Sequence, residues 1–205
     1  MCARYIVEPK FSEEIERALR QIEKRLKMMD EIDDSVEKEC RPTDEVPVIT
    51  LEKDDLVVSK KRFGMVAQIP GERSDGSLVI NARSESILQK PLFSHAFEKH
   101  RVVIPASAFI EWNSKKEKSK FRPKNGKILY FAGCYQKDME GDRFVIITTG
   151  ANASMEAVHD RMPLTLEEGE ILTWLSSSEQ ARKILTKVPD ELQRETEYEQ
   201  MSLFG

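Results

Sequence analysis

Cysteine is scarce in this sequence, with only Cys2, Cys40 and Cys134 among 205 residues. An odd number at wide spacing argues against a disulfide framework and indicates a reducing compartment. Neither a Cys-x-x-Cys pair nor a His-x-x-x-His pair occurs. We therefore expect no structural zinc site, no other metal site and no cofactor.

Long apolar runs are absent too. No stretch of 18 apolar residues occurs, so we expect no transmembrane helix. The start of the chain lacks a basic region followed by an apolar stretch, so we expect no secretory signal. The chain also lacks a Gly-rich phosphate loop, internal repeats and low-complexity tracts. Because 40% of the residues are hydrophobic and 33% are charged, we expect a cytoplasmic monomer with no membrane partner.

What the sequence does contain is a series of short strand-like runs separated by turn signals such as Asn125-Gly126. The runs are Val46–Leu51, Leu56–Ser59, Phe63–Ile69, Leu78–Ala82, Val102–Pro105, Phe109–Trp112, Ile128–Tyr135 and Phe144–Thr149. Since few of them alternate with helices, they predict an α+β fold with a mostly antiparallel, barrel-like β core and peripheral helices.

Four segments predict those helices. They are an amphipathic stretch at Phe11–Met29, a stretch at Ser86–His100 interrupted by Pro91, and short helices at Ser154–His159 and Ser178–Leu185. Residues 1–189 are expected to form a single domain, and residues 190–205 an acidic C-terminal tail.

Charge is distributed unevenly along the chain. The formal net charge is −4, yet residues 59–127 hold 15 Lys and Arg against 6 Asp and Glu, a local +9 that leaves −13 for the rest. A basic middle segment suits a phosphate-binding face. Four lysines in it, Lys115, Lys116, Lys118 and Lys120, are interpreted as a solvated loop tip.

Cys2 occupies the position with the most distinctive chemistry. If Met1 is removed, Cys2 carries a free α-amine beside its thiol, and this 1,2-aminothiol can capture an aldehyde as a Schiff base that closes to a thiazolidine. An unperturbed thiol has a pKa of roughly 8.5 and an α-amine one of about 7.8, so both groups are partly deprotonated near neutral pH. The alternative is that Cys2 belongs to a mobile tail.

Four further blocks carry polar groups at strand ends or in apolar strands: Ile80–Glu85, Pro105–Trp112, Ile147–Asn152 and His159–Pro163. Glu111 lies within an apolar strand, where a carboxylate is either paired or suited to proton transfer. Asp160 can tune the neighbouring imidazole of His159.

Each block also has a structural interpretation. Asn81 can bond to backbone at a strand end, and Arg83 can form an ion pair with Glu85 that contributes little. Glu111 can be a satisfied core carboxylate, and Asp160 can belong to an ordinary turn.

Taken in order, these segments resemble the SOS-response-associated peptidase (SRAP) family. The matching motifs are Met1-Cys2-Ala3-Arg4, Asn81–Glu85, Phe109-Ile110-Glu111-Trp112, Thr148–Asn152 and His159–Pro163, with weaker matches at Pro42–Thr43, Val46–Ile49 and Lys90–Phe93. The resemblance covers roughly residues 1–175.

The resemblance implies a DNA damage response protein that senses abasic sites in single-stranded DNA and links to them covalently. It implies that Cys2 is the nucleophile, that Glu111 and His159 move protons, and that Asn81 orients the N-terminus or the sugar. It further implies DNA contacts by Arg4, Arg83 and Arg161. Self-removal of Met1 is a second activity implied by the family, although ordinary methionine removal would also expose Cys2.

Two departures from the family pattern bear on this prediction. Ala3 replaces the usual glycine, which makes a positive φ at that position costly. The segment from Phe63 to Pro70 lacks the family's tryptophans, so Phe63, Met65 and Phe93 are the candidates for a wedge that stacks on bases beside the lesion.

Two other function classes compete with covalent repair. One is a module that binds single-stranded DNA and shields lesions without a covalent bond, and the other is an N-terminal-nucleophile amidohydrolase that uses Cys2. Separately, Gln200-Met201-Ser202-Leu203-Phe204 resembles the pentapeptide by which bacterial proteins dock on the replicative sliding clamp, with Gln200, Leu203 and Phe204 as the contact residues. Alternatively, Leu203 and Phe204 pack on the domain.

Overall fold

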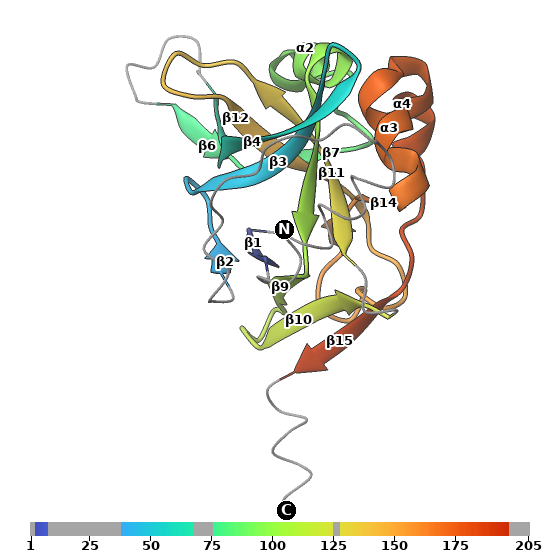
Figure 1. The fold of residues 1–205 in the computed structure, drawn as a ribbon. Helices are drawn as coiled ribbons and strands as arrows, with labels where there is room; N and C mark the ends of the chain where they lie inside the picture. The colour runs from blue at the N-terminus through green and yellow to red at the C-terminus, as the bar shows by residue number, and fades with distance from the viewer. Residues whose placement is uncertain (1–2, 8–37, 68–75, 125–127, 197–205) are drawn as a thin grey trace, which may run out of the picture.

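The computed structural model describes residues 3–7, 38–67, 76–124 and 128–196 (Figure 1). These residues form two large β-sheets, one small two-stranded sheet and a few short helices. The mostly β, antiparallel-rich architecture confirms that part of the predicted fold class.

The smaller of the two large sheets has five strands. In spatial order they are β15 (Leu192–Thr196), β10 (Lys118–Pro123), β9 (Ala108–Trp112), β1 (Arg4–Val7) and β2 (Lys38–Cys40). The N-terminal strand β1 therefore lies inside this sheet, antiparallel to β9 on one side and to β2 on the other.

The larger sheet has eight strands. In order they are β13 (Arg161–Pro163), β12 (Arg143–Gly150), β4 (Asp55–Phe63), β3 (Glu45–Glu52), β8 (Arg101–Ala106), β11 (Leu129–Gln136) and β14 (Thr165–Leu166), with β7 (Asn81–Arg83) paired to β12. Strands β4 and β7 run parallel to β12, and β12 also pairs with β11. The barrel-like form of the core stays a prediction. A separate hairpin joins β5 (Met65–Ala67) to β6 (Ser77–Val79).

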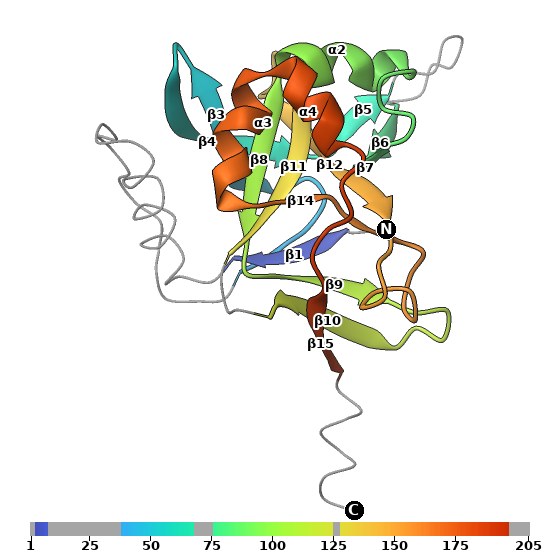
Figure 2. The same ribbon diagram turned by 90° about the vertical axis from the view of Figure 1, so that its right-hand side faces the viewer.

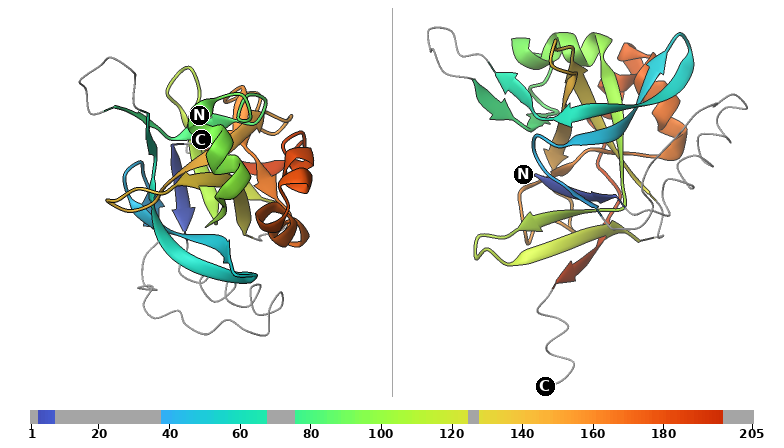
Figure 3. Two further views of the ribbon diagram at one scale, coloured as in Figure 1. Left: turned by 90° about the horizontal axis from the view of Figure 1, so that it is seen from above. Right: turned by 60° about the vertical axis from the view of Figure 1, so that its left-hand side comes forward.

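Helices cover one face of the larger sheet, as Figures 2 and 3 show. They are α2 (Pro91–Lys99), a 3₁₀ turn η1 (Glu168–Glu170), α3 (Ile171–Ser176) and α4 (Ser178–Ile184). Because successive side chains of a strand point to opposite faces, β12 contributes to two cores. Val145 and Ile147 pack under the helices, and Phe144 and Ile146 pack between the two sheets.

The chain passes from one sheet to the other at Ser107, between β8 and β9. Ser107 donates both its backbone N–H and its hydroxyl to the carbonyl oxygen of Ile6, at 2.7 Å and 2.9 Å. Beside this crossing, Tyr5 packs edge-on against Phe63 and Phe131 in the core between the sheets. The position of β1 is thus fixed by hydrogen bonds and by aromatic packing.

Arg101 joins the helices to the sheet. Its side chain is buried, and its guanidinium donates to the carbonyl oxygens of Trp174 at 2.5 Å, Phe97 at 2.7 Å and Leu175 at 3.1 Å, at the C-terminal ends of α2 and α3. Burial lowers the pKa of Arg101, but an arginine remains charged in proteins. Its charge also suits the negative ends of two helix dipoles.

We expect Arg101→Met to destabilise the protein by about 3–5 kcal/mol, because several buried carbonyl groups lose a charged donor together. Urea unfolding measures this cost. Arg182→Met is the matched control, since Arg182 is exposed and bonds Glu98 at the surface, and it should cost less than about 1 kcal/mol. An Arg101→Met protein as stable as the control would contradict this role.

The structure corrects several predicted boundaries. The helix expected at Ser86–His100 begins only at Pro91, and residues 154–159 form turns instead of a helix. Lys118 and Lys120, interpreted as part of a loop tip, lie in β10. Strand β15 pairs with β10, so residues 192–196 belong to the sheet instead of a separate tail after residue 189.

Other predictions fall on parts of the chain that the structure does not describe. The amphipathic stretch Phe11–Met29 and the clamp-binding residues Gln200, Leu203 and Phe204 all lie outside the described residues. Within the described part of the chain, no helix has both the length and the apolar character needed to cross a membrane.

Candidate functional site

The N-terminal strand leads directly to Glu111. Arg4 pairs with Ile110 and Tyr5 with Phe109, in antiparallel register. The chain that precedes Arg4 therefore runs alongside the end of β9, where Glu111 follows Ile110. Continued by one residue, this register sets Ala3 opposite Glu111. Cys2 itself lies outside the described residues.

Glu111 faces the space between the two sheets. Phe109 belongs to the core between the sheets, and Glu111 follows it by two residues on the same strand, so both side chains lie on the same face. The side chain is buried, with 6% of the residue exposed. A carboxyl group in such surroundings is shielded from bulk water and is positioned to exchange protons with a neighbouring group.

Asn81 approaches the same space from the larger sheet. It pairs with Ile146 in the parallel pairing of β7 with β12, and its Nδ2 lies 3.5 Å from the carbonyl oxygen of Ile146. Since Ile146 belongs to the core between the sheets, Asn81 shares that face. Arg83 pairs with Thr148 two residues further on, on the same face, and is exposed.

Three strands place these residues at one end of the molecule. Figure 2 shows β12 and β9 ending, and β1 starting, on the same side. Glu111 lies near the end of β9, and β7 runs beside Ile146–Thr148 of β12. Glu111 thus lies at the end of the space between the sheets from which β1 starts, and Asn81 borders the same space from the larger sheet.

Thr148 is a buried polar residue at this end that the sequence reading did not single out. It is fully buried, and its Oγ1 has no hydrogen-bond partner among the described residues. A buried hydroxyl without a partner is costly. The feature of the sequence that could have identified Thr148 is a pair of adjacent threonines at the end of an otherwise apolar strand.

His159 follows the turns after β12 and has contacts suited to two protonation states. Its Nδ1 lies 2.9 Å from the backbone N–H of Arg161 and 2.8 Å from Oδ1 of Asp160. A neutral ring accepts from the N–H, and a protonated ring donates to the carboxylate. Because Nδ1 has a partner in either state, these contacts fix the orientation of the ring.

Arg161 connects two of the motif blocks. Its guanidinium donates to both carboxylate oxygens of Glu85, at 2.7 Å and 2.8 Å, and to the carbonyl oxygen of Thr148 at 2.7 Å. The side chain is only 12% exposed. These bonds give Arg161 a positioning role, and its predicted contact with DNA stays a prediction.

The bond to Arg161 lowers the pKa of Glu85. The pair therefore stabilises the fold above the ordinary glutamate pKa, and this contribution is lost as the pH falls through the lowered value. We expect Glu85→Gln to be less stable than the native protein at pH 7, by about 1 kcal/mol or less because Glu85 is half exposed. The difference should vanish in acid.

Thermal unfolding at a series of pH values tests this expectation. Glu179→Gln is the control, because Glu179 forms only an exposed pair with Lys183 on one helix. It should show little difference from the native protein at any pH. A Glu85→Gln deficit that persists unchanged in acid would contradict the assigned cause.

Asn152 holds the turns formed by residues 153–158. Its Oδ1 accepts from the N–H and the hydroxyl of Ser154, at 3.0 Å and 2.6 Å. Its Nδ2 donates to the carbonyl oxygens of Pro189 and Asp190, at 2.9 Å and 3.0 Å. One amide thus fixes the segment that leads to His159 and ties it to the chain before β15.

Arg4 lies on the opposite face of β1 from the core between the sheets. Its guanidinium sits over the ring of Trp112, 4.8 Å from the centroid, and Nη1 lies 3.1 Å from a carboxylate oxygen of Glu39. These contacts join β1 to both neighbouring strands. Arg4 therefore anchors the N-terminal strand, and its predicted phosphate contact stays a prediction.

The predicted wedge residues are also core residues. Phe63 is fully buried and stacks on Phe144, with ring centroids 5.2 Å apart. Met65 and Phe93 are buried as well. Because a side chain inside the core has no face to offer a base, none of the three can act as the wedge.

The basic middle segment does not form one continuous face. Lys61 and Arg101 are buried, and Arg62, Arg122 and Lys124 pair with surface carboxylates. Whether an exposed cation of this segment can bind phosphate therefore depends on its own surroundings.

The two described cysteines are unsuited to nucleophilic chemistry. Cys40 and Cys134 are buried and form no disulfide, and burial raises the pKa of Cys134 to about 12. Since the thiolate is the reactive form, the Cys134 thiol is unreactive. No group of three or more His, Cys, Asp or Glu side chains among the described residues is arranged to hold a metal ion.

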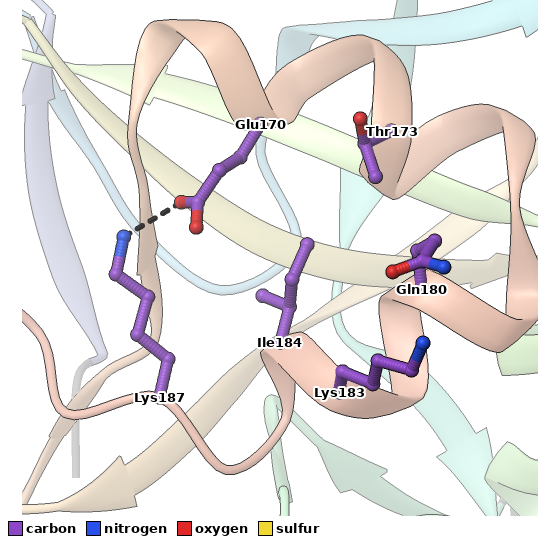
Figure 4. Close-up of a pocket in the computed structure, with 6 residues that line it drawn as sticks. All are labelled: Glu170, Thr173, Gln180, Lys183, Ile184 and Lys187. Atoms are coloured by element: carbon purple, nitrogen blue, oxygen red, sulfur yellow. Dashed lines mark hydrogen bonds and ion pairs between the residues drawn. The ribbon is translucent and has the colours of Figure 1, made fainter.

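A hollow between α3 and α4 lies on the helical side (Figure 4). Lys187 at its rim donates to Glu170 at 2.6 Å and to Glu167 at 2.9 Å. Burial alone would lower the pKa of Lys187, but these two carboxylates outweigh burial and raise it. The charge is therefore neutralised within the protein, and we assign no binding role to this hollow.

Comparison with known proteins identifies a single family. The family model described as SOS response associated peptidase (SRAP) matches residues 1–202. The chain is 32% identical over 144 residues to the abasic site processing protein YoqW of Bacillus subtilis, covering 66% of this chain and 64% of the relative. It is 31% identical over 144 residues to YoaM of the same species, covering 66% and 63%. The chain thus spans just under two thirds of these relatives.

Solved structures share the fold. A crystal structure of a protein from Bordetella bronchiseptica superimposes with a TM-score of 0.71 at 21% identity, covering 95% of this chain and 99% of that one. A phage-related protein of the same organism gives a TM-score of 0.71 at 18% identity, covering 95% and 93%.

Proposed function

Because the chain belongs to the SOS response associated peptidase family, we propose that it acts in DNA damage handling by forming a covalent bond between Cys2 and abasic sites in single-stranded DNA. The relatives named as abasic site processing proteins support the choice of substrate. The observation that carries the proposal is the register of β1 with β9, which, continued by one residue, sets Ala3 opposite the buried Glu111.

The proposed reaction matches the groups at the site. The ring-opened sugar of an abasic site presents an aldehyde. The α-amine of Cys2 adds to the aldehyde carbon, the resulting carbinolamine loses water to give an iminium ion, and the thiolate attacks the same carbon. The net change joins the aldehyde and the aminothiol as a thiazolidine and releases one water.

Glu111 and His159 are assigned the proton transfers of this sequence. One must take a proton from the attacking amine, and one must give a proton to the departing hydroxyl group. Asn81 is assigned the orientation of the amine or the sugar, and the exposed Arg83 binds a phosphate beside the lesion. Thr148 adds a buried hydroxyl beside Arg83.

The experiment that tests the proposal compares two oligonucleotides. One carries an aldehyde-bearing abasic site, and the other carries a tetrahydrofuran analogue that cannot open to an aldehyde. We expect a band that survives denaturation with the first and none with the second. Binding to both without an adduct would instead support the non-covalent shielding module, and hydrolysis of small amides without DNA binding would support the amidohydrolase.

The proposal has further parts that concern processing and partners. Removal of Met1 precedes the reaction, either by the protein itself or by a separate aminopeptidase. We place the protein in the cytosol as a monomer. Docking of residues 200–204 on the sliding clamp is a separate element, and deletion of residues 200–205 should abolish binding to purified clamp. Unchanged binding would show that these residues do not dock the protein on the clamp.

A further inference from the structure

The turn between β9 and β10 is built by one side chain. Trp112 pairs with Lys118, which leaves residues 113–117 as the turn. Asn113 Oδ1 accepts from the backbone N–H groups of Lys115 at 2.9 Å and Glu117 at 3.0 Å, and its Nδ2 donates to a carboxylate oxygen of Glu117 at 2.6 Å. The turn is therefore held in one conformation before any partner binds.

This turn presents two cations. Lys115 and Lys116 are both exposed, and neither forms an ion pair within the described residues. Lys116 has a φ of +63°, which L-residues other than glycine, asparagine and aspartate seldom adopt. The bond from Asn113 keeps the single carboxylate of the turn, Glu117, within the turn. A lysine in this conformation, next to a second exposed lysine, presents positive charge at a fixed point.

The turn also lies at the end of the molecule that holds the candidate site. It continues from β9, whose last residues are Glu111 and Trp112, and Figure 2 shows this hairpin projecting on the side where β12 ends. At no more than roughly 3.3 Å per residue, the four residues from Glu111 to Lys115 span at most roughly 13 Å of chain path. A DNA strand whose lesion lies at Glu111 has phosphates within that reach.

We propose that Lys115 and Lys116 bind phosphates of the DNA strand on one side of the abasic site. The proposal rests on the proposed function for the identity of the ligand. It changes the interpretation of these two lysines from a solvated turn to a phosphate contact that sets how the strand enters the site. The contact is independent of base sequence, because phosphates carry no sequence information.

The test measures equilibrium binding of single-stranded oligonucleotides with the tetrahydrofuran analogue, so that no covalent bond forms. The double variant Lys115→Ala/Lys116→Asn removes both charges, and asparagine tolerates the positive φ. Since each phosphate contact on single strands contributes about 0.7 to the salt slope of log affinity, the variant should lose about 1.4 of that slope. The matched control, Lys99→Ala/Lys137→Ala, removes two exposed lysines, one at the end of α2 and one directly after β11, and should leave the slope unchanged.

Oligonucleotides shortened on one side of the lesion or the other show on which side the two lysines bind. The effect of the double variant should disappear when nucleotides on one side are removed and persist when the other side is shortened. An unchanged salt slope, or an effect that is equal on every oligonucleotide, would overturn the proposal. If the native protein forms no adduct with the aldehyde substrate while the slope still changes, the proposed function fails and the phosphate contact stands.

Discussion

Replacement of Cys2 by alanine is expected to abolish the denaturation-resistant adduct with abasic single-stranded DNA. Alanine keeps the α-amine after Met1 is removed, so a Schiff base can still form, but no thiol remains to close the ring. The adduct should therefore be seen only when borohydride reduces the Schiff base. Denaturing gels with and without reductant measure both outcomes.

Two variants sharpen this prediction. Cys2→Ser keeps the amine and offers a hydroxyl, which is not deprotonated near neutral pH, and should behave like Cys2→Ala. Cys134→Ala removes a thiol that is buried and whose pKa is raised to about 12, and should crosslink as the native protein does. A stable adduct formed by Cys2→Ala without reductant would assign the bond to a lysine and would refute the role of Cys2.

Glu111→Gln is expected to slow adduct formation by about 10²–10⁴-fold, the range typical of a lost general acid or base. Glutamine has nearly the same shape and keeps a hydrogen-bonding side chain at the end of β9, but it cannot exchange a proton. Binding of the tetrahydrofuran analogue should change little, because that ligand requires no proton transfer. Single-turnover rates at saturating DNA, together with the binding constant, separate the two effects.

A control at a neighbouring acidic residue is provided by Glu117→Gln. Glu117 bonds Asn113 within the turn that follows β9, and it is outside the space between the sheets. Its replacement should leave the single-turnover rate within about threefold of the native value, which is less than one kcal/mol in barrier. Equal rate losses in both variants would indicate a general electrostatic effect in place of a catalytic role for Glu111.

The individual strands were predictable because their apolar runs are bounded by turn residues. The runs at Phe109–Trp112 and Phe144–Thr149 correspond closely to β9 and β12. Asn81 and Glu111 could also be singled out, because each is a polar residue in or beside an apolar strand, and both border the space between the sheets. Their roles stay predictions.

The arrangement of the strands was not predictable from local pattern. Strand β1 inserts between β9 and β2, and its partner residues in β9 lie more than 100 positions away in sequence. Register of this kind is set by which faces are buried together. The anchoring of Arg4 by Trp112 and Glu39 follows from that insertion, and so could not be seen in the sequence.

The aromatic wedge shows a different limit. Phe63 and Phe93 were selected because the family pattern has aromatic residues nearby, but large apolar side chains are more often core than surface. Phe63 packs on Phe144 between the sheets. Similarly, alternating lysines at Lys118 and Lys120 suggested a solvated loop, although alternation with the buried Ser119 and Phe121 is the signature of a strand with one buried face.

The central claim is that Cys2, freed of Met1, bonds to the aldehyde of an abasic site. The most direct test is the intact mass of the denatured product formed with an abasic oligonucleotide of known length. The account predicts the mass of the protein without Met1 plus that of the oligonucleotide, minus one water. An adduct on protein that retains Met1, or the absence of any adduct, would contradict it.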